Sequence, residues 1–259
     1  MTDTPILELH GISKSFGAVQ ALYEVDFHVS AGEVMALVGD NGAGKSTLIK
    51  CIAGIYSIDS GEVFFEGEPV SIHGPKDAAR LGIEVVYQDL ALADNLDVVQ
   101  NMFLGREETT RPLRSLDELT MEKRANDTLS SLSVTTIRSV RQTVAGLSGG
   151  QRQSVAVAKA VMWNSKVVIL DEPTAALGVA QTRQVLDLVK RLGQQGLAVV
   201  LISHNLHDIF EVADSITVLR LGQNVAEYKR AEVTQTQVVE AITAGKLSKV
   251  PGLSEEVIA

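Results

Sequence analysis

A run of nine residues has the composition of a loop that binds phosphate. It fits the pattern G-x-x-x-x-G-K-[ST] and consists of Gly39, Asp40, Asn41, Gly42, Ala43, Gly44, Lys45, Ser46 and Thr47. Glycines let backbone N–H groups turn toward phosphate oxygens, and a helix that starts here adds the positive end of its dipole. The Lys45 ammonium suits the outer phosphates, and the Ser46 hydroxyl suits Mg²⁺. We therefore expect a nucleotide site here rather than a glycine-rich turn without a ligand.

Two adjacent carboxylates, Asp171 and Glu172, follow the apolar run at 167–170. A strand that ends there places Asp171 at the carboxyl edge of the sheet, where ligands sit in such folds. We expect Asp171 to hold Mg²⁺ through water and Glu172 to face an attacking water. Such a pair is often only a helix cap, but the phosphate loop in the same chain favours the catalytic interpretation.

The elements that must position these residues are strands and helices in alternation. Continuous apolar runs rich in β-branched residues predict buried parallel strands at 34–38, 83–87, 167–170 and 198–202. Between the last two runs, apolar residues recur at helical spacing, at Val185, Leu188, Val189 and Leu192. Strand, helix and strand in this order form a βαβ unit. The predicted fold class is α/β, with a mainly parallel central sheet and helices on both of its faces.

Two regions depart from this pattern. Short alternating stretches at 5–33 and 61–72 predict a small antiparallel β layer at one edge, with a hairpin turn at Glu66–Gly67. The segment at 91–162 has many helix formers and no clear strand, which indicates a helical subdomain inserted into the sheet. We expect the tail at 246–259 to be loosely held.

Composition limits the function classes. The chain has 259 residues, which we interpret as a single domain, and 23 Lys and Arg against 32 Asp and Glu give a net charge of −9. A broad basic face for nucleic acid is therefore not expected. The single cysteine, Cys51, cannot form an internal disulfide, and we expect it in the core. No apolar run approaches the ~20 residues that span a bilayer, so any membrane association must use a partner.

A second glycine-rich motif precedes an apolar helix pattern, at Leu147, Ser148, Gly149, Gly150 and Gln151. Ser and glycines before a helix make another anion-binding end, which would serve the γ-phosphate bound by another copy. With this motif, the sequence resembles the ATP-binding subunits of ABC transporters over nearly its whole length. The phosphate loop, LSGGQ, VVILDEP, Gln88 after IEVVY and His204 after AVVLIS stand in that family's order and spacing.

The resemblance implies a P-loop NTPase fold, ATP and Mg²⁺ as cofactors, and a role for each matching residue. Phe16 would stack on adenine, and Gln88 would sense Mg²⁺ and the attacking water. Glu172 would be the general base and His204 would contact the γ-phosphate, while Ser46, Gln88 and Asp171 would hold the metal. Residues 148–151 would close over the ATP of a partner subunit. Two alternatives stay open: Phe16 as a core residue, and His204 as a capping or packing residue.

One departure narrows the resemblance. Many family members carry Ser-Ala-Leu-Asp after DEPT, whereas residues 175–178 read Ala-Ala-Leu-Gly, as in sugar importers of the ribose, xylose and fructose type. This similarity implies an ATPase subunit at the cytoplasmic face of the membrane. Its partners would be a second copy or a similar cassette in a head-to-tail dimer, membrane permease subunits and, indirectly, an external sugar-binding protein. A soluble, non-transport ABC ATPase that acts on nucleic acid or ribosomes is the alternative, as is a module that binds nucleotide without turnover.

The segment that follows Gln88 is a candidate for contact with the permease. We expect Leu90, Leu92, Leu96 and Met102 to line an open apolar groove that takes a short permease helix. The alternative is that this face packs inside the helical subdomain, which we expect for Val99 and Phe103.

Overall fold

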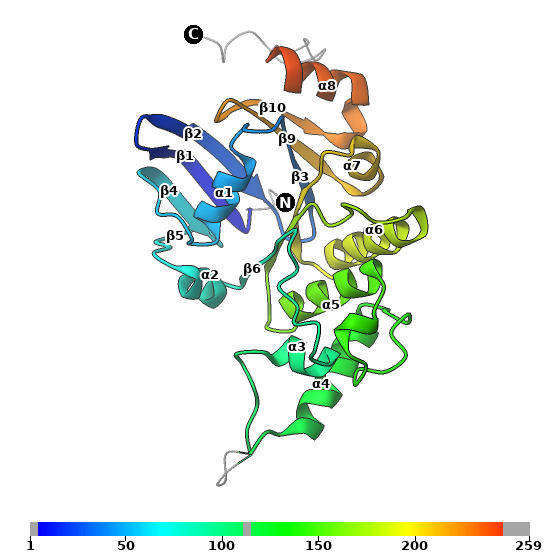
Figure 1. Ribbon diagram of the computed structural model, residues 1–259. Coiled ribbons are helices and arrows are strands. Elements are labelled where there is room, and N and C mark those ends of the chain that lie inside the picture. Colours follow the sequence, from blue (N-terminus) through cyan, green and yellow to red (C-terminus); the bar gives the residue numbers. More distant parts are fainter. Residues whose placement is uncertain (1–4, 111–114, 246–259) are drawn as a thin grey trace.

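The computed structural model describes residues 5–110 and 115–245. The tail at 246–259, which we expect to be loosely held, lies outside the described residues. The chain folds around a central sheet, with a smaller antiparallel sheet beside it and a group of helices at one end (Figure 1). No helix in the described ranges combines the length and the apolar character needed to cross a membrane.

The central sheet has the strand order β10-β9-β3-β8-β7-β6 and is parallel except for the β9–β10 pair. Its strands are β3 (Val34–Val38), β6 (Ile83–Val86), β7 (Val167–Asp171), β8 (Ala198–Ile202), β9 (Ser215–Arg220) and β10 (Gln223–Lys229). The predictions for β3, β6, β7 and β8 are confirmed, and so is the mainly parallel sheet. The hairpin of β9 and β10 is an addition that the apolar pattern does not predict.

Alternate residues of the middle strands enter two separate cores. In β7, Val167 and Ile169 pack on one face of the sheet and Val168 and Leu170 on the other. Burial on both faces explains why these strands are continuously apolar rather than alternating. The helices that cover the sheet are α1 (Lys45–Ile52), α2 (Pro75–Leu81), α6 (Val179–Gln194), α7 (Leu206–Val212) and α8 (Gln235–Ala244), with the 3₁₀ turn η2 (Arg230–Glu232) before α8.

The antiparallel sheet has the order β2-β1-β4-β5 and packs its apolar side on α1. Its strands are β1 (Leu7–Phe16), β2 (Val19–Val29), β4 (Ser60–Phe65) and β5 (Glu68–Val70). Glu66 and Gly67 join β4 to β5 with φ values of 53° and 81°, as a tight hairpin turn requires. The predicted antiparallel layer and its turn are therefore confirmed. Cys51, on α1, is buried in the same core, as expected.

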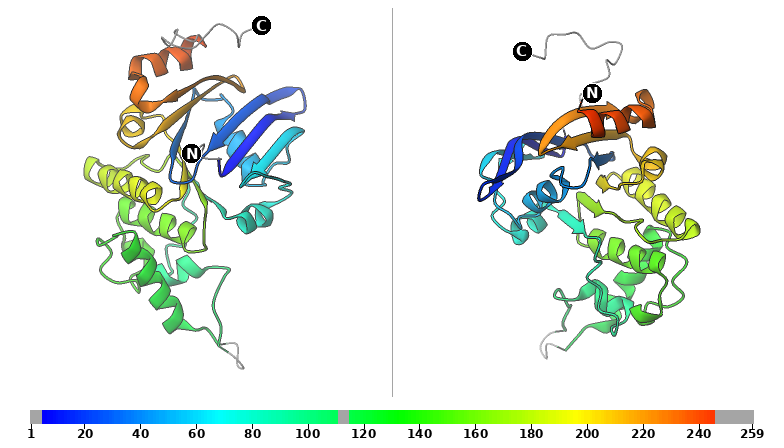
Figure 2. Two further views of the ribbon diagram at one scale, coloured as in Figure 1. Left: turned by 180° about the vertical axis from the view of Figure 1, so that it is seen from behind. Right: turned by 45° about the horizontal axis from the view of Figure 1, so that its top comes forward.

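The helical region lies at the opposite end of the molecule from α8 (Figure 2). It contains α3 (Val98–Phe103), α4 (Glu118–Ser131), the 3₁₀ turn η1 (Val144–Gly146) and α5 (Gly149–Val161). Val99 and Phe103 are buried, as expected, and the ring of Phe103 meets the ring of Trp163 edge-on at 5.6 Å. Met102 is only 1% exposed, so the expectation that it lines an open groove is wrong. Every residue of α3 except Gln100 is buried, so this short helix has no apolar face open to solvent.

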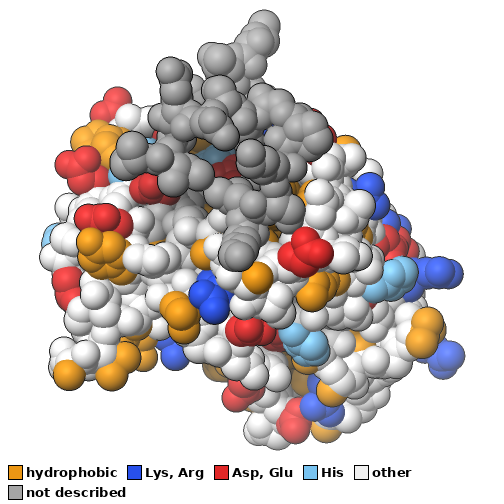
Figure 3. Space-filling model, turned by 90° about the horizontal axis from the view of Figure 1, so that it is seen from above, with side chains coloured by type: hydrophobic (Ala, Val, Ile, Leu, Met, Phe, Trp, Pro, Cys, Tyr) orange, Lys and Arg blue, Asp and Glu red, His pale blue; other side chains and the backbone are white. Residues whose placement is uncertain are grey.

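The surface is of mixed charge where the described residues can be seen from above. Figure 3 shows acidic and basic side chains interspersed with hydrophobic ones on that face, outside the atoms drawn in grey. Interspersed charges do not form the clustered positive field that binding to a nucleic-acid backbone requires.

Candidate nucleotide site

The phosphate loop runs from the end of β3 to the start of α1, and two of its glycines are required by close backbone contacts. A Cβ atom on Gly39, which has φ 152°, would lie 2.2 Å from the carbonyl oxygen of Leu219 on β9. A Cβ atom on Gly44, with φ 104°, would lie 2.8 Å from the side chain of Leu22 on β2. Strands from both sheets therefore press on the loop and fix its path.

The N-terminus of α1 is open. Its N-cap is Gly44, and no side chain caps it among the described residues. The Lys45 ammonium instead lies along the loop, where Nζ donates hydrogen bonds to the carbonyl oxygens of Gly39 at 2.6 Å and Asp40 at 2.9 Å. Burial lowers the pKa of Lys45, an effect that the charges of Glu172, Asp40 and Asp171 oppose. A partly buried cation beside free helix amides is suited to an anion.

Asp171 and Glu172 stand at the carboxyl end of β7. Burial raises the pKa of Asp171, the charge of Glu172 raises it further, and Lys45 and Lys50 oppose both effects. Glu172 adopts φ 52°, a left-handed conformation that costs a non-glycine residue roughly 1–2 kcal/mol. Its amide donates a hydrogen bond to the carbonyl oxygen of Ile202 at 2.9 Å, which holds this turn against the end of β8.

Glu172 and His204 are in direct contact. Oε2 of Glu172 lies 2.7 Å from Nδ1 of His204, and the side chains are 17% and 78% exposed. The two atoms are close but not in hydrogen-bond geometry, so Oε2 is a buried oxygen that accepts no hydrogen bond from the described residues. Such an atom normally has a partner. Here the 2.7 Å contact with His204 takes the place of that partner.

A cavity of about 460 Å³ joins these elements. Its lining comprises Val19, Gln20, Ala21, Asn41, Gly42, Ala43, Gly44, Lys45, Ser46, Thr47, Gln88, Asp171 and Glu172. The structure thus brings together most of the predicted phosphate loop, both carboxylates and Gln88. The sequence does not indicate Val19, Gln20 or Ala21, because β2 reaches the loop only through the tertiary fold.

Phe16 lies outside that lining. Its ring is at the end of β1, where it meets Tyr56 edge-on at 5.0 Å and is 43% exposed. The alternative in which Phe16 is a core residue is therefore wrong. An exposed ring is free to stack on a base, and that role stays a prediction.

The second glycine-rich motif forms the N-terminus of α5 and does not line the cavity. Ser148 and Gln151 form a reciprocal capping box: the Ser148 amide donates to Oε1 of Gln151 at 2.8 Å, and the Gln151 amide donates to Oγ of Ser148 at 3.4 Å. Nε2 of Gln151 also donates to the carbonyl oxygen of Thr136 at 2.6 Å. A Cβ atom on Gly149 would lie 2.8 Å from the side chain of Leu177, just before α6. The motif is therefore held by its own chain, apart from the phosphate loop.

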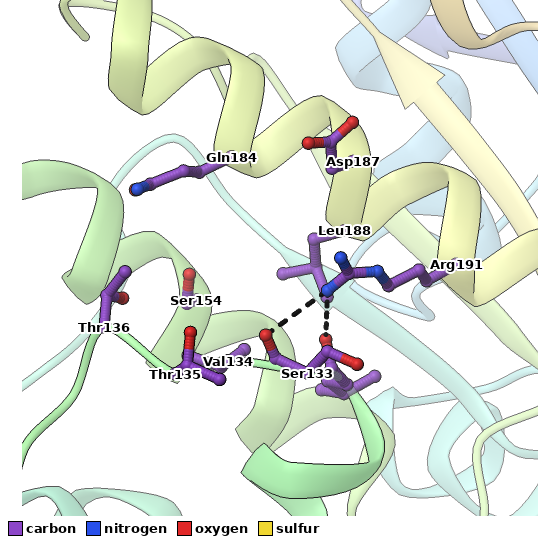
Figure 4. Close-up of a pocket in the computed structure, with 10 residues that line it drawn as sticks. Ser133, Val134, Thr135, Thr136, Ser154, Gln184, Asp187, Leu188 and Arg191 are labelled. Carbon is purple, nitrogen blue, oxygen red and sulfur yellow. Dashed lines mark hydrogen bonds between the residues drawn. The ribbon is translucent and has the colours of Figure 1, made fainter.

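The helical region is joined to α6 at a second, smaller cavity of about 170 Å³ (Figure 4). Arg191 of α6 points to the end of α4, where Nη1 donates to the carbonyl oxygens of Leu132 at 3.0 Å and Ser133 at 3.3 Å. Gln195 adds a hydrogen bond from Nε2 to the carbonyl oxygen of Ser131 at 2.8 Å. These bonds satisfy carbonyls that the end of a helix leaves free. This cavity belongs to the joint between the two parts of the molecule.

Comparison with known proteins shows the family of this chain. The family described as ABC transporter matches residues 22–175. The fructose import ATP-binding protein FrcA of Rhizobium meliloti is 47% identical over 252 residues, which cover 95% of this chain and 96% of that protein. The xylose/arabinose import ATP-binding protein XylG of Sulfolobus acidocaldarius is 45% identical over 245 residues, with the same coverage of 95% and 96%. The chain belongs to the ABC transporter family.

Solved structures give the same result at the level of the fold. A nucleotide-free ATP-binding cassette from an ABC transporter aligns with a TM-score of 0.78 and 28% identity, covering 87% of this chain and 92% of that one. A dimeric post-hydrolysis structure of the cassette MJ0796, bound to ADP and phosphate, aligns with a TM-score of 0.71 and 25% identity, covering 86% and 98%. The predicted fold class is confirmed.

Proposed function

We propose that this chain is the ATP-hydrolysing subunit of a carbohydrate importer. The observation that carries the proposal is the cavity in which the phosphate loop meets Gln88, Asp171 and Glu172 at the end of the parallel strands. Ligands bind at this edge in open α/β sheets. The class of cargo rests on the two relatives, which are named as import proteins for fructose and for xylose or arabinose.

Mg²⁺ fits the oxygen atoms that the cavity offers. Ser46, Gln88 and Asp171 all line it, and burial together with the charge of Glu172 raises the pKa of Asp171, an effect that a bound cation would oppose. Hard oxygen ligands of this kind, together with phosphate oxygens, are what Mg²⁺ prefers. When bound, Mg²⁺ neutralises negative charge on the outer phosphates. We assign these three residues to the metal and residues 39–47 to the phosphates.

Glu172 is the group that takes the proton from the attacking water. Glu172 lines the cavity and its side chain is 17% exposed, so a water in the cavity can reach the carboxylate. The contact between Oε2 and His204 restrains the carboxylate, and the rest of the His204 side chain is exposed, as contact with a γ-phosphate requires. General-base assistance of this kind contributes about 10²–10⁴-fold to a rate.

The second half of each site comes from another subunit. Within residues 148–151, Ser148 and Gly149 are exposed, Gln151 is half-buried and Gly150 is buried, and none of the four lines this chain's own cavity, so the exposed end is available to the ATP of a second cassette. The dimeric MJ0796 structure shows that cassettes of this fold associate in pairs. We assign a head-to-tail dimer of two copies, or of this chain with a similar cassette.

The transport partners are permease subunits, with the cassette at the cytoplasmic face of the membrane and a sugar-binding protein on the outer side. Leu90 and Leu92 are only partly buried where they pack on the helical core, directly after Gln88. Leu96 is likewise half-buried. These three leucines, without Met102, form the surface that we assign to a permease helix.

The experiment that tests the hydrolytic site is Glu172→Gln. We expect ATP affinity to stay within twofold and turnover to fall at least ~100-fold, because the amide cannot accept the proton. Phosphate release measures turnover and equilibrium binding measures affinity. Because a variant that binds ATP without hydrolysing it should remain dimeric, gel filtration with Mg-ATP detects that dimer. Glu62→Gln, an exposed carboxylate on β4, is the matched control. Turnover at the parent rate in Glu172→Gln would remove Glu172 as the base.

The transport assignment is tested by Leu92→Glu. A charge on this surface should abolish sugar uptake by cells that carry the variant in place of the parent subunit, while the isolated variant still hydrolyses ATP. Leu119→Glu is the matched control, because Leu119 is 82% exposed on α4 and lies outside the assigned surface. If Leu92→Glu unfolds the isolated subunit, Leu92 is a core residue; if uptake survives, the permease binds elsewhere.

A further inference from the structure

We infer that Asp208 is a positioning residue that holds the loops of Glu172 and His204 in a single arrangement. Asp208 lies on α7 and does not line the nucleotide cavity, and it is only 3% exposed. A carboxylate this buried is costly unless both of its oxygens are hydrogen-bonded. The hydrogen-bond partners of Asp208 therefore indicate its role.

Both oxygens of Asp208 are used, and by different loops. Oδ2 accepts a hydrogen bond from Oγ1 of Thr174 at 2.7 Å, and Oδ1 accepts one from Nδ2 of Asn205 at 2.9 Å. Thr174 lies two residues after Glu172, and Asn205 directly follows His204. A single buried carboxylate thus cross-links the turn that carries the base to the loop that carries the histidine.

The network requires an acceptor at position 208. Oδ1 of Asn205 accepts a hydrogen bond from the amide of His207 at 3.1 Å, which caps α7 and leaves Nδ2 to face Asp208. The backbone N–H of Asn205 donates to Oγ of Ser203 at 3.0 Å, which fixes the loop on the other side of His204. Because the side-chain amide of Asn205 is oriented by the His207 N–H, only an acceptor oxygen suits the position opposite Nδ2.

The Asp208 cross-link bears on catalysis because it supports the short contact between Glu172 and His204. Glu172 and His204 approach to 2.7 Å although His204 is 78% exposed and has little packing to hold it. The strand pairing and the bond from the Glu172 amide to the carbonyl oxygen of Ile202 restrain the backbone before His204 but not the loop after it. Asp208 supplies that second restraint. Small displacements of catalytic groups are expensive, since about 1 Å can cost ~10²-fold in rate.

The test is Asp208→Leu, which keeps a similar volume but removes both acceptor oxygens, so that neither Asn205 Nδ2 nor Thr174 Oγ1 has a partner at position 208. Because this inference rests on the proposed roles of Glu172 and His204, Glu172→Gln is assayed in parallel. We expect Asp208→Leu to lower kcat for ATP hydrolysis by about tenfold, with KM and ATP affinity within twofold of the parent. Asp187→Leu, at an exposed carboxylate on α6, is the matched control and should keep the parent kcat.

A pair of variants at Thr174 separates positioning from folding, and it decides the matter if Asp208→Leu does not fold. Thr174→Val removes the donor to Asp208 and should lower kcat severalfold, whereas Thr174→Ser restores the hydroxyl and should restore kcat. Three results overturn the inference: parent kcat in a folded Asp208→Leu, a loss that appears in ATP affinity rather than kcat, or equal rates for the two Thr174 variants. If Glu172→Gln keeps the parent rate, the proposed base has failed, whatever Asp208 does.

Discussion

The helices α1 and α5 both begin directly after a glycine-rich motif, but their N-termini are in opposite states. The end of α1 has Gly44 at its N-cap and no side chain that bonds to its free amides among the described residues. The end of α5 is closed by the reciprocal cap of Ser148 and Gln151. One end is open to a phosphate, and the other is satisfied by its own chain. The two motifs, which look alike as anion-binding ends in the sequence, therefore differ in what must happen before they bind.

This difference fits two halves of one site that meet only on assembly. The loop, Lys45 and both carboxylates already share a cavity, so the α1 end needs only a movement of the Lys45 side chain away from the carbonyl oxygens of Gly39 and Asp40. The α5 end has a weak bond at 3.4 Å from the Gln151 amide to the Ser148 hydroxyl, which a phosphate can replace at little cost. An open end binds first and a capped end joins later, which gives the order of events in the proposed dimer.

The largest effect is expected at α1. Lys45→Ala should weaken ATP binding by about 100-fold, because a partly buried cation loses its hydrogen bonds to phosphate. Lys50→Ala, one turn further along the same helix, is the control and should change affinity much less. Equilibrium titration of the isolated subunit with ATP measures both. Unchanged affinity in Lys45→Ala would mean that α1 is not the open phosphate end.

The next largest effect is expected at the N-terminus of α5, where a substitution should lower the rate of hydrolysis without changing the affinity for ATP. Ser148→Arg should abolish hydrolysis, since the bulky side chain blocks the end that faces a partner's nucleotide, while the isolated variant binds ATP as the parent does. Mixing Ser148→Arg with Lys45→Ala sharpens the comparison, because neither variant alone should hydrolyse ATP. In a mixed dimer, the intact loop of the first meets the intact motif of the second, so about half of the parent activity per dimer should return. No recovery would show that the two ends do not combine across subunits.

The sequence predicts the α1 end better than the α5 end for a physical reason. Residues 39–47 are consecutive and follow a strand buried on both faces, so local pattern alone places them. The strands β7 and β8 were predictable for the same reason. The β9–β10 hairpin was not, because β9 buries the polar side chains of Ser215 and Thr217 and interrupts the apolar pattern.

The parts of the site that escaped prediction depend on tertiary contacts. Gln20 reaches the cavity because an antiparallel sheet packs beside the loop, and Asp208 meets Thr174 across 34 residues of sequence. The prediction for Met102 was wrong for a related reason. An apolar residue in a helix pattern is equally compatible with an exposed groove and with the core, and only the packing of the folded chain distinguishes them. The sequence predicts an anion-binding helix end at Ser148, but it does not predict that Gln151 caps this end.

The smallest expected effect is on the free energy of unfolding in the absence of nucleotide. It measures how much the Ser148 cap stabilises the N-terminus of α5. Ser148→Ala removes the side-chain cap of α5 and should lower the free energy of unfolding by about 1 kcal/mol. Ser46→Ala removes a hydroxyl near the start of α1 that has no hydrogen-bond partner among the described residues, so its change should stay within about 0.5 kcal/mol. Urea unfolding of both variants, followed by circular dichroism in the absence of ATP and Mg²⁺, gives the two values. Equal decreases in the free energy of unfolding for the two variants would mean that the N-terminus of α5 is as open as that of α1. In that case the partner's nucleotide would not have to replace the Ser148 cap on binding.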